Sequence, residues 1–480
     1  MGICKNEYRI CHGWYLDCQA KYMLFGLTLA IVGAGMASID PAARPTEPLF
    51  PRLTGGPGRM TPERVARHQK ARLEGAMVEA VARHGYAGTT MRELVALAGV
   101  SKTTFYQHFE NKQECFLATF DEIVAELGKR VGEGYRSGGD FRERLTAGLA
   151  VFMNMAVDEP AAASLTTVES LTLGSAGVAH RERASQAFEA LIQQSFDHSP
   201  SELQVSEMTV RAIVAGIRGV TYRRVRGGRP EDLPGLVEEL ADWALRFQEP
   251  DSEATRRAIA ASEREPVEVS PGDQSDDAQK AGWDEPPDSP NSRASLTQRE
   301  RIVRAAAKVG VERGYEALSI PAISGAAGVS NQTFYEHFAS KRDAFLAAFE
   351  ILGGDALANA ASTFQRQSDY PEAIGTSVRA LLEHIAANEL FARLAFFELP
   401  TAGPVALDRA DAMLDSFSAF LEPPVSPSEL GGPLPRSILE AIPSGIWATI
   451  QHEIAHGRRQ ALPQIAPELV RVVIASFREP

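Results

Sequence analysis

Apolar residues recur with the period of a helix in two widely separated parts of the chain. The first stripe consists of Leu73, Met77, Ala80 and Val81, and the second of Ile302, Ala305, Ala306 and Val309. Residues three and four apart share one face of a helix, so each stripe predicts an amphipathic helix with a buried side. Long stretches rich in Ala, Leu, Glu and Arg, with little Val/Ile/Thr alternation, favour an all-α fold for the whole chain.

Each stripe is followed by signals for two further, shorter helices. The signals are a glycine that ends the first helix, a hydroxyl that caps the second, a glycine that ends it and a serine that caps the third. In chain order they are Gly85, Thr90, Gly99 and Ser101 in the first half and Gly314, Ser319, Gly328 and Ser330 in the second. Two short helices joined by a turn that contains glycine are typical of a helix-turn-helix.

The two halves are copies of one module. Ala98–Lys112 (AGVSKTTFYQHFENK) and Ala327–Lys341 (AGVSNQTFYEHFASK) are identical at 10 of 15 positions, at a constant offset of 229. The same offset relates Glu169 to Glu398 and, near the C-terminal ends, Gly216-Ile217 to Gly445-Ile446. The repeat is therefore a whole module of about 190 residues rather than a short motif that occurs twice.

This repeat predicts the domain organisation. We expect an atypical N-terminal extension, a helix-turn-helix head and a helical body, then an acidic flexible linker, a second head and a second body. Their ranges are 1–59, 60–117, 118–248, 249–296, 297–346 and 347–480. The linker is expected to be flexible because it holds 12 acidic and 5 basic residues, several prolines and little apolar periodicity.

Residues 1–59 resemble neither module. The apolar run Tyr22–Met36 is 15 residues long and follows three basic residues, whereas a membrane span needs about 20 residues. Met60, Thr61 and Pro62 together resemble a start followed by a helix N-terminus. We interpret 1–59 as an upstream over-extension of the reading frame; a membrane anchor and a disordered or partly helical tail are the alternatives.

Composition and charge limit the function. The chain has 480 residues, 44% hydrophobic and 23% charged, which is typical of globular domains, and its net charge of −13 argues against indiscriminate binding to nucleic acid. Each predicted head nevertheless carries a local net charge of +2, as phosphate binding requires. Four cysteines do not make a disulfide framework. The sequence holds no metal constellation, phosphate loop or nucleophile motif, so we expect no cofactor and no enzymatic activity.

The third helix of each head has an inner and an outer face. Phe105 and Phe109, like Phe334 and Phe338, are spaced i, i+4 and are expected in the core. Hydroxyls, an imidazole and a lysine lie between and after them, and such groups suit contacts with DNA phosphates. The alternative is a generic helical hairpin with ordinary surface residues, which two matched copies make less plausible.

On these residues the chain resembles the TetR family of bacterial repressors. Both modules match its signature of a small residue, Gly-Val-Ser, Thr, an aromatic residue, Tyr, His-Phe and Lys. The resemblance implies a three-helix DNA-binding head and a helical body that binds a small molecule and thereby releases operator DNA. It also implies dimerisation through the last two helices, here Ser206–Arg224 with Pro234–Phe247 and Ser437–His456 with Pro463–Phe477.

The resemblance also implies roles for individual residues. Base readers would be Arg92, Lys102, Thr103 and Gln107 in the first head and Asn331 and Gln332 in the second. Phosphate contacts would be Thr90, Thr104, Tyr106, His108 and Lys112, and then Ser319, Thr333, Tyr335, His337 and Lys341. The second head departs from the first because Pro321 replaces an arginine and Glu336 replaces a glutamine. A carboxylate near DNA repels phosphate or accepts a hydrogen bond from cytosine, so the second head's affinity is in question.

The effector cannot be named from the sequence. Candidate ligand-binding residues are Glu169, Phe391, Phe396, Phe397 and Glu398. Apolar residues at helical spacing are more often simple core, and the two glutamates can either bind a polar group or cap a helix. The predicted partners are therefore double-stranded operator DNA and an unidentified small molecule.

These features predict a ligand-responsive repressor, cytoplasmic and associated with the nucleoid. The main alternative is an adaptor whose second head has lost its operator; an enzyme on a helical bundle has no support in the sequence. We expect the two modules to pair within one chain, with a homodimer as the alternative. Arg223, Arg224 and Arg226 of the first module correspond to His452, Glu453 and Ala455 of the second, and this difference in charge favours pairing of unlike modules.

Overall fold

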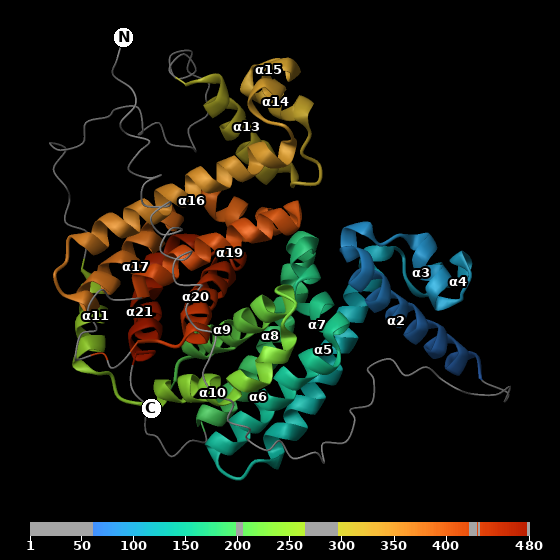
Figure 1. Ribbon diagram of the computed structural model, residues 1–480, viewed down its shortest axis with the longest axis horizontal. Helices are drawn as coiled ribbons and strands as arrows, with labels where there is room; N and C mark the ends of the chain where they lie inside the picture. The colour runs from blue at the N-terminus through green and yellow to red at the C-terminus, as the bar shows by residue number, and fades with distance from the viewer. Residues whose placement is uncertain (1–60, 198–204, 265–295, 422–429, 431–432, 478–480) are drawn as a thin grey trace, which may run out of the picture. The chain divides into compact units, whose positions relative to one another are not determined.

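A computed structural model describes residues 61–197, 205–264, 296–421, 430 and 433–477, all of which belong to one unit, residues 48–480. Every regular element within these ranges is a helix, which confirms the all-α prediction (Figure 1). The interpretations of residues 1–59, including the apolar run Tyr22–Met36, fall outside the described residues.

The first module contains nine α-helices that the structure describes. Its head is formed by α2 (Pro62–Gly88), α3 (Met91–Ala98) and α4 (Lys102–His108). Its body is formed by α5 (Lys112–Ser137), α6 (Phe141–Asp158), α7 (Pro160–Thr167), α8 (Gly174–Asp197), α9 (Glu207–Arg226) and α10 (Val237–Leu245). A 3-10 turn, η1 (Glu169–Leu173), separates α7 from α8.

The second module repeats this order with local changes. Its head is formed by α13 (Gln298–Arg313), α14 (Ile320–Ala327) and α15 (Asn331–His337). Its body is formed by α16 (Lys341–Gln365), α17 (Tyr370–Ala387), α18 (Glu389–Arg393), α19 (Pro404–Ser418), α20 (Arg436–Ala455) and α21 (Ala466–Ala475). Between α18 and α19 lie a π-helical turn, η4 (Leu394–Glu398), and a 3-10 turn, η5 (Leu399–Ala402).

The predicted caps are present at the heads. The Thr61 hydroxyl accepts a hydrogen bond from the Arg64 N–H at 3.4 Å, and Pro62 occupies the first helical turn. Gly85 has a φ of 67°, which interrupts α2 at the predicted position, and Gly99 ends α3 with a φ of 58°. Both glycines adopt the left-handed conformation that other residues rarely take, so they set the turns between the head helices.

Each head closes around the aromatic pair predicted from the sequence. Phe105 and Phe109 are buried with ring centroids 5.7 Å apart, and they pack in one cluster with Leu73 and Met77 of α2. The equivalent Phe334 belongs to the corresponding cluster of the second module. Burial of side chains of this size stabilises a fold by about 1.5–3 kcal/mol each.

Helix α16 is the one helix of the described ranges that is long and apolar enough to cross a membrane by length and composition alone. More than half (56%) of the relevant window is buried inside the chain, and the helix runs from the second head along its body. Its apolar character is that of a core helix, since Phe345, Phe349 and Leu352 are buried.

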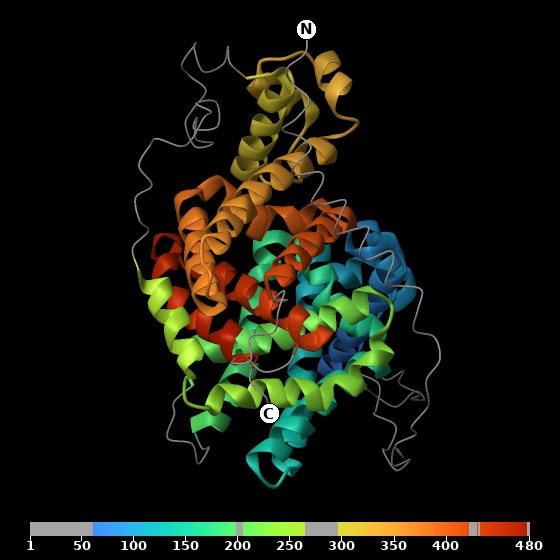
Figure 2. The ribbon, with the colours of Figure 1, turned by 60° about the vertical axis from the view of Figure 1, so that its left-hand side comes forward.

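The predicted flexible linker 249–296 is wrong in its first part. Residues Glu253–Glu263 form helix α11, capped by Ser252, and in both ribbon views α11 runs beside helices α17 and α21 (Figures 1 and 2). The buried stripe consists of small residues, Ala254, Ala258 and Ala261, which pack closely against the α17 backbone where Gly375 lies. Close packing of backbones thus replaces the large apolar side chains whose absence suggested disorder.

The modules contact each other through equivalent helices, α9 and α20. Arginines of α9 face acidic residues of the second module, which are not the residues at the equivalent positions. Arg223 pairs with Asp415, Arg224 with Glu440, and Arg226 with Asp408 and Asp411. Glu453 pairs with Arg458 of its own module, because both lie at the same end of α20.

Replacing Ala258 by Leu should lower the free energy of unfolding by about 1–3 kcal/mol, because the larger side chain overpacks the contact between α11 and α17. Ala260 is exposed on the same helix, so Ala260→Leu should change this free energy by less than about 0.5 kcal/mol. Denaturant titration followed by circular dichroism measures both. Equal effects of the two substitutions would contradict the packing of α11.

Candidate DNA-binding surface and ligand cavities

The outer face of α4 carries most of the predicted base readers. Lys102, Thr103 and Gln107 are exposed, and Arg92 is exposed on α3. Tyr106 also faces outward, with 52% of its surface accessible, although aromatic side chains of this size are usually covered. An exposed tyrosine beside exposed amide and ammonium groups suits contact with a DNA groove and its phosphates.

The second head presents the same arrangement with a different outer face. Asn331 and Gln332 are exposed on α15, and Tyr335 is 61% accessible. The Gln332 side-chain amide donates a hydrogen bond to Glu336 at 3.4 Å, so the carboxylate competes with bases for this predicted reader. Pro321 is exposed on α14, where the first head has Arg92.

The hydroxyls predicted to contact phosphates also hold the helix ends in place. Thr90 and Ser319 accept hydrogen bonds from the third residue of the following helix, as N-caps. Thr104 and Thr333 share hydrogen bonds with the capping serines of α4 and α15, at 2.9 and 3.0 Å between hydroxyl oxygens. These residues therefore lie at the N-terminal ends of the head helices, where backbone N–H groups also point outward.

The two histidines each contact the first helix of their own head. The His108 Nε2 lies 3.2 Å from Gln69 Oε1, and His337 Nε2 lies 3.5 Å from the equivalent Gln298 Oε1. His337 remains exposed, whereas His108 is half-buried. Each imidazole is positioned by a glutamine that the sequence pattern alone did not single out.

The structure gives Lys112 and Lys341 a role other than the predicted phosphate contact. Lys112 Nζ donates to the carbonyl oxygens of Tyr86 and Thr89 at 2.8 and 3.0 Å and lies 4.2 Å from the centre of the Tyr86 ring. Burial lowers the pKa of Lys112. Lys341 makes the equivalent contacts with the segment after α13. Both ammonium groups satisfy carbonyls at the end of the first head helix, and their donors are directed inward.

Glu169 and Glu398 are not among the lining residues of the two body cavities, and each accepts a hydrogen bond from the backbone of its own head. Glu169 accepts a hydrogen bond from the Tyr86 N–H at 2.8 Å, and Glu398 accepts one from the Tyr315 N–H at 3.1 Å. Each carboxylate thus joins the body to the segment after the first head helix. Burial raises the pKa of Glu398, and its hydrogen bond with Tyr315 opposes this rise.

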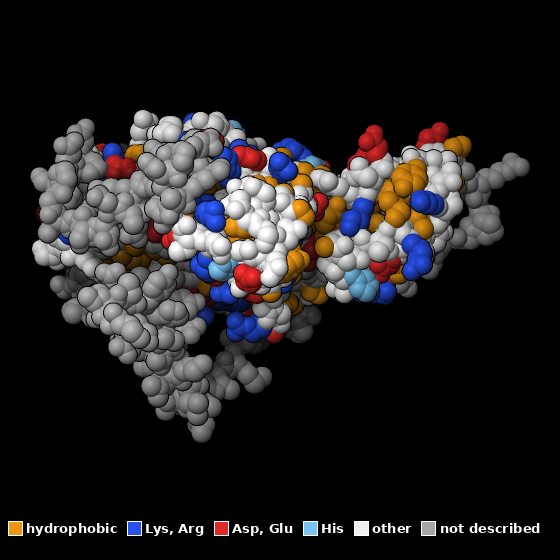
Figure 3. All heavy atoms as spheres, turned by 90° about the horizontal axis from the view of Figure 1, so that it is seen from above, with side chains coloured by type: hydrophobic (Ala, Val, Ile, Leu, Met, Phe, Trp, Pro, Cys, Tyr) orange, Lys and Arg blue, Asp and Glu red, His pale blue; other side chains and the backbone are white. Residues whose placement is uncertain are grey.

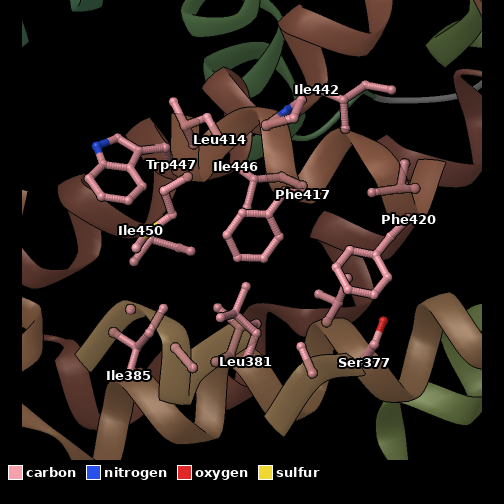
Figure 4. Close-up of a pocket in the computed structure, with 18 of the residues that line it drawn as sticks. Ser377, Leu381, Ile385, Leu414, Phe417, Phe420, Ile442, Ile446, Trp447 and Ile450 are labelled. Atoms are coloured by element: carbon pink, nitrogen blue, oxygen red, sulfur yellow. The ribbon is translucent and has the colours of Figure 1, made fainter. Parts of the chain in front are cut away.

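The second body contains an apolar cavity of about 80 Å³. Figure 4 shows Phe417, Phe420 and Trp447 around it, with Leu381 and Ile385 of α17 on the opposite wall. Of the candidate ligand-binding residues of this module, Phe391 and Phe396 line the cavity, and Phe397 and Glu398 are not among its lining residues.

The first body contains a second cavity that the sequence analysis did not locate. Its volume is about 130 Å³, and it lies among α5, α6, α8 and α9. Phe120, Phe152 and Phe188 are among its apolar walls, and Arg181 and Arg218 also line it. Each module therefore has a largely apolar cavity of the kind that takes small molecules.

Charge is not gathered into one continuous basic patch on the face that Figure 3 shows. Lys and Arg side chains lie interspersed there with acidic and hydrophobic ones.

Comparison with known proteins places the two heads in one family. The family model described as bacterial regulatory proteins, tetR family, matches residues 75–128 and again 302–348. The chain therefore carries two DNA-binding domains of the TetR type. It is therefore a DNA-binding transcriptional regulator rather than an enzyme, and TetR-family regulators are soluble cytoplasmic proteins.

Relatives of the chain include both activators and repressors. The transcriptional activator FasR of Mycolicibacterium smegmatis is 27% identical over 164 residues, which is 33% of this chain and 74% of FasR. The repressor AcnR of Corynebacterium efficiens is 39% identical over 61 residues, only 13% of this chain and 32% of AcnR. The crystal structure of FadR from Bacillus subtilis in complex with stearoyl-CoA is also similar. FadR is 16% identical to this chain, the match covers 36% of this chain and 96% of FadR, and the TM-score is 0.34.

Lys112→Met should lower the free energy of unfolding by about 1–2 kcal/mol, because it leaves the Tyr86 and Thr89 carbonyls without their donor. Lys102→Met should leave stability unchanged, because Lys102 is exposed, and should lose about 1–3 kcal/mol of discrimination at one base pair. Thermal unfolding and binding to DNA selected from a random library measure the two effects. A stable Lys112→Met protein with a reduced salt dependence of DNA binding would instead restore the phosphate assignment.

Proposed function

We propose that this TetR-family regulator is a ligand-responsive repressor that binds operator DNA through two unequal heads paired within one chain. The observation that carries the proposal is the packing of the equivalent helices α9 and α20 against each other. The family resemblance assigns this region to dimerisation, so the fused modules take the place of two subunits. Binding at an operator would hold the chain on the nucleoid.

Buried charge supports pairing of the first module with the second. Arg224 Nη1 donates to Glu440 Oε2 at 2.7 Å, and both side chains are buried. At the offset of 229, Arg211 is the equivalent of Glu440, and Glu453 is the equivalent of Arg224. Two first modules would therefore bring Arg224 against Arg211, and two second modules would bring Glu453 against Glu440. Like charges in a buried contact repel strongly, so unlike modules are the favoured pair.

The link between cavity and head supports a response to a ligand. Thr167 lines the first cavity, and Glu169, two residues later, holds the Tyr86 N–H. The equivalent Phe396 lines the second cavity, and Glu398, again two residues later, holds the Tyr315 N–H. A ligand that displaces either cavity wall would therefore move the carboxylate that positions the head.

The heads are proposed to be unequal because their outer faces differ in charge. Glu336 occupies the position of Gln107 and engages the neighbouring Gln332. An adaptor in which the second head no longer reads DNA is the alternative function that this contact favours. The two functions differ in the operator, which has two dissimilar half-sites for a repressor with two working heads and one half-site for the adaptor.

The whole chain should have the mass of one chain, 52.0 kDa, in light scattering at micromolar concentration, and should bind an asymmetric operator as one chain per site. Electrophoretic shift and footprinting on the gene's own upstream region measure the second part. Protection of one half-site would favour the adaptor, and failure to bind any DNA would overturn the regulatory proposal.

Charge variants provide the control. Glu440→Arg places two arginines together in a buried contact, so it should destabilise the chain by about 3–5 kcal/mol or drive exchange between chains. Arg224→Glu combined with Glu440→Arg should restore much of the stability and the mass of one chain. A wild-type mass of two chains, with both half-sites read identically, would contradict pairing within one chain.

A further inference from the structure

The two cavities occupy equivalent positions in their modules but differ in the polarity of their walls. Five polar residues line the first cavity: Thr166, Thr167, Arg181, Ser185 and Arg218. At the offset of 229 every one of them is replaced by an apolar residue: Ala395, Phe396, Ala410, Leu414 and Trp447. Phe396, Leu414 and Trp447 line the second cavity.

Two cations of the first cavity make their direct contacts with neutral groups in the described part of the chain. Arg218 donates to the Ser185 hydroxyl, and Arg181 Nη2 donates to Gln451 Oε1 at 3.5 Å. Within the ranges that the structure describes, neither guanidinium forms an ion pair. Glu182 and Glu189 stabilise these charges only at longer range, and a buried cation gains further stability when an anion pairs with it directly.

The nearby carboxylates are already engaged by other residues. Glu182 lies 2.5 Å from the ring Nδ1 of His452, and Glu189 pairs with Arg211 at 3.3 Å. Burial, followed by repulsion from Arg218, lowers the pKa of Arg181 to about 9, so this group remains charged at neutral pH. The first cavity therefore carries positive charge and hydroxyl groups on one part of its wall and apolar side chains on the rest.

We propose that the first module's cavity binds a small amphiphilic carboxylate, with its apolar body among the phenylalanines and its carboxylate on Arg181 and Arg218. This assignment rests on the proposed ligand-responsive function and names its effector class. The second cavity has no charged lining residue and takes only uncharged apolar molecules. A guanidinium pair suits a carboxylate because its N–H groups match both oxygens. The volume of about 130 Å³ corresponds to on the order of ten water-sized sites, hence a ligand of roughly ten non-hydrogen atoms.

A carboxylate at Arg181 would also be sensed by the second module. Arg181 contacts Gln451 of α20, and the Gln451 side-chain amide donates to the Phe396 carbonyl at 2.6 Å. Phe396 lines the second cavity and lies two residues before Glu398, which holds the second head. One ligand in the first module thus reaches both heads, through Thr167 and Glu169 on one side and through Gln451 and Phe396 on the other.

The test is isothermal titration of the whole chain with octanoate and, separately, with 1-octanol. Octanoate should bind at one site and more tightly than the alcohol. Arg181→Gln and Arg218→Gln should each weaken octanoate binding by roughly tenfold or more, since each removes a charge-assisted hydrogen bond, and should change octanol binding by less than about twofold. Equal affinity for acid and alcohol in the wild-type chain, or no effect of either substitution, would overturn the proposal.

Equivalent positions provide the matched control for which cavity is used. Gly148 lines the first cavity and Ser377, its equivalent, lines the second. Gly148→Leu should abolish octanoate binding by filling the first cavity, whereas Ser377→Leu should leave it intact; the reverse result would overturn the assignment. Thermal unfolding verifies that each variant is folded. Titration needs no DNA, so failure here is distinct from failure of operator binding.

Discussion

The close crossing of α9 and α20 is the constraint on which the rest of the structure depends. A Cβ on Gly216 would lie 2.9 Å from the Ala441 carbonyl oxygen, and a Cβ on Gly445 would lie 2.5 Å from the Ala212 carbonyl oxygen. These are equivalent contacts, because both pairs are related by the offset of 229. Only glycine permits the backbones to approach so closely, and the same glycine is retained in both copies. The crossing is therefore two-fold in geometry although the chain around it is not.

Each head depends on this core through a hydrogen bond that crosses from body to head. The left-handed turn at Gly85, with a φ of 67°, is followed directly by the Tyr86 N–H that Glu169 accepts, and Gly314 precedes Tyr315 in the same way with a φ of 81°. Lys112 satisfies the carbonyls on the other side of this turn. The turn is thus held by an anion from the body and a cation from the head's own next helix. A change in the body that displaces the carboxylate alters the turn, and the recognition helix beyond it, without any contact with DNA.

Features that depend on nearby residues in the chain could be predicted from the sequence, whereas features that depend on tertiary contacts could not. The head helices were predictable because Thr61, Ser101 and Gly99 act on residues within four positions of themselves. The contact of Lys112 with backbone carbonyls could not be predicted, because its acceptors lie 23 and 26 residues earlier in the chain. The signature alone suggests a lysine that faces the DNA. Helix α11 was missed because its buried stripe is alanine, which carries little hydrophobic signal although it allows close packing. The first cavity was missed because Arg181 and Arg218 come from different helices, yet comparison of the two copies at an offset of 229 contains the signal.

Residues that the two copies share and residues in which they differ occupy different kinds of position. Residues that the copies share lie where geometry is demanding, at the helix crossing, the glycine turns and the aromatic pairs of the heads. Residues that differ between the copies lie on the recognition helices, at the buried charges between the modules and in the cavity walls. In a homodimer one sequence must serve both sides, so the two heads and the two cavities must carry the same residues. Fusion removes that restriction, because each side is encoded separately. One symmetric scaffold can therefore carry two different heads and two different cavities, and the asymmetry is confined to positions that leave the crossing undisturbed.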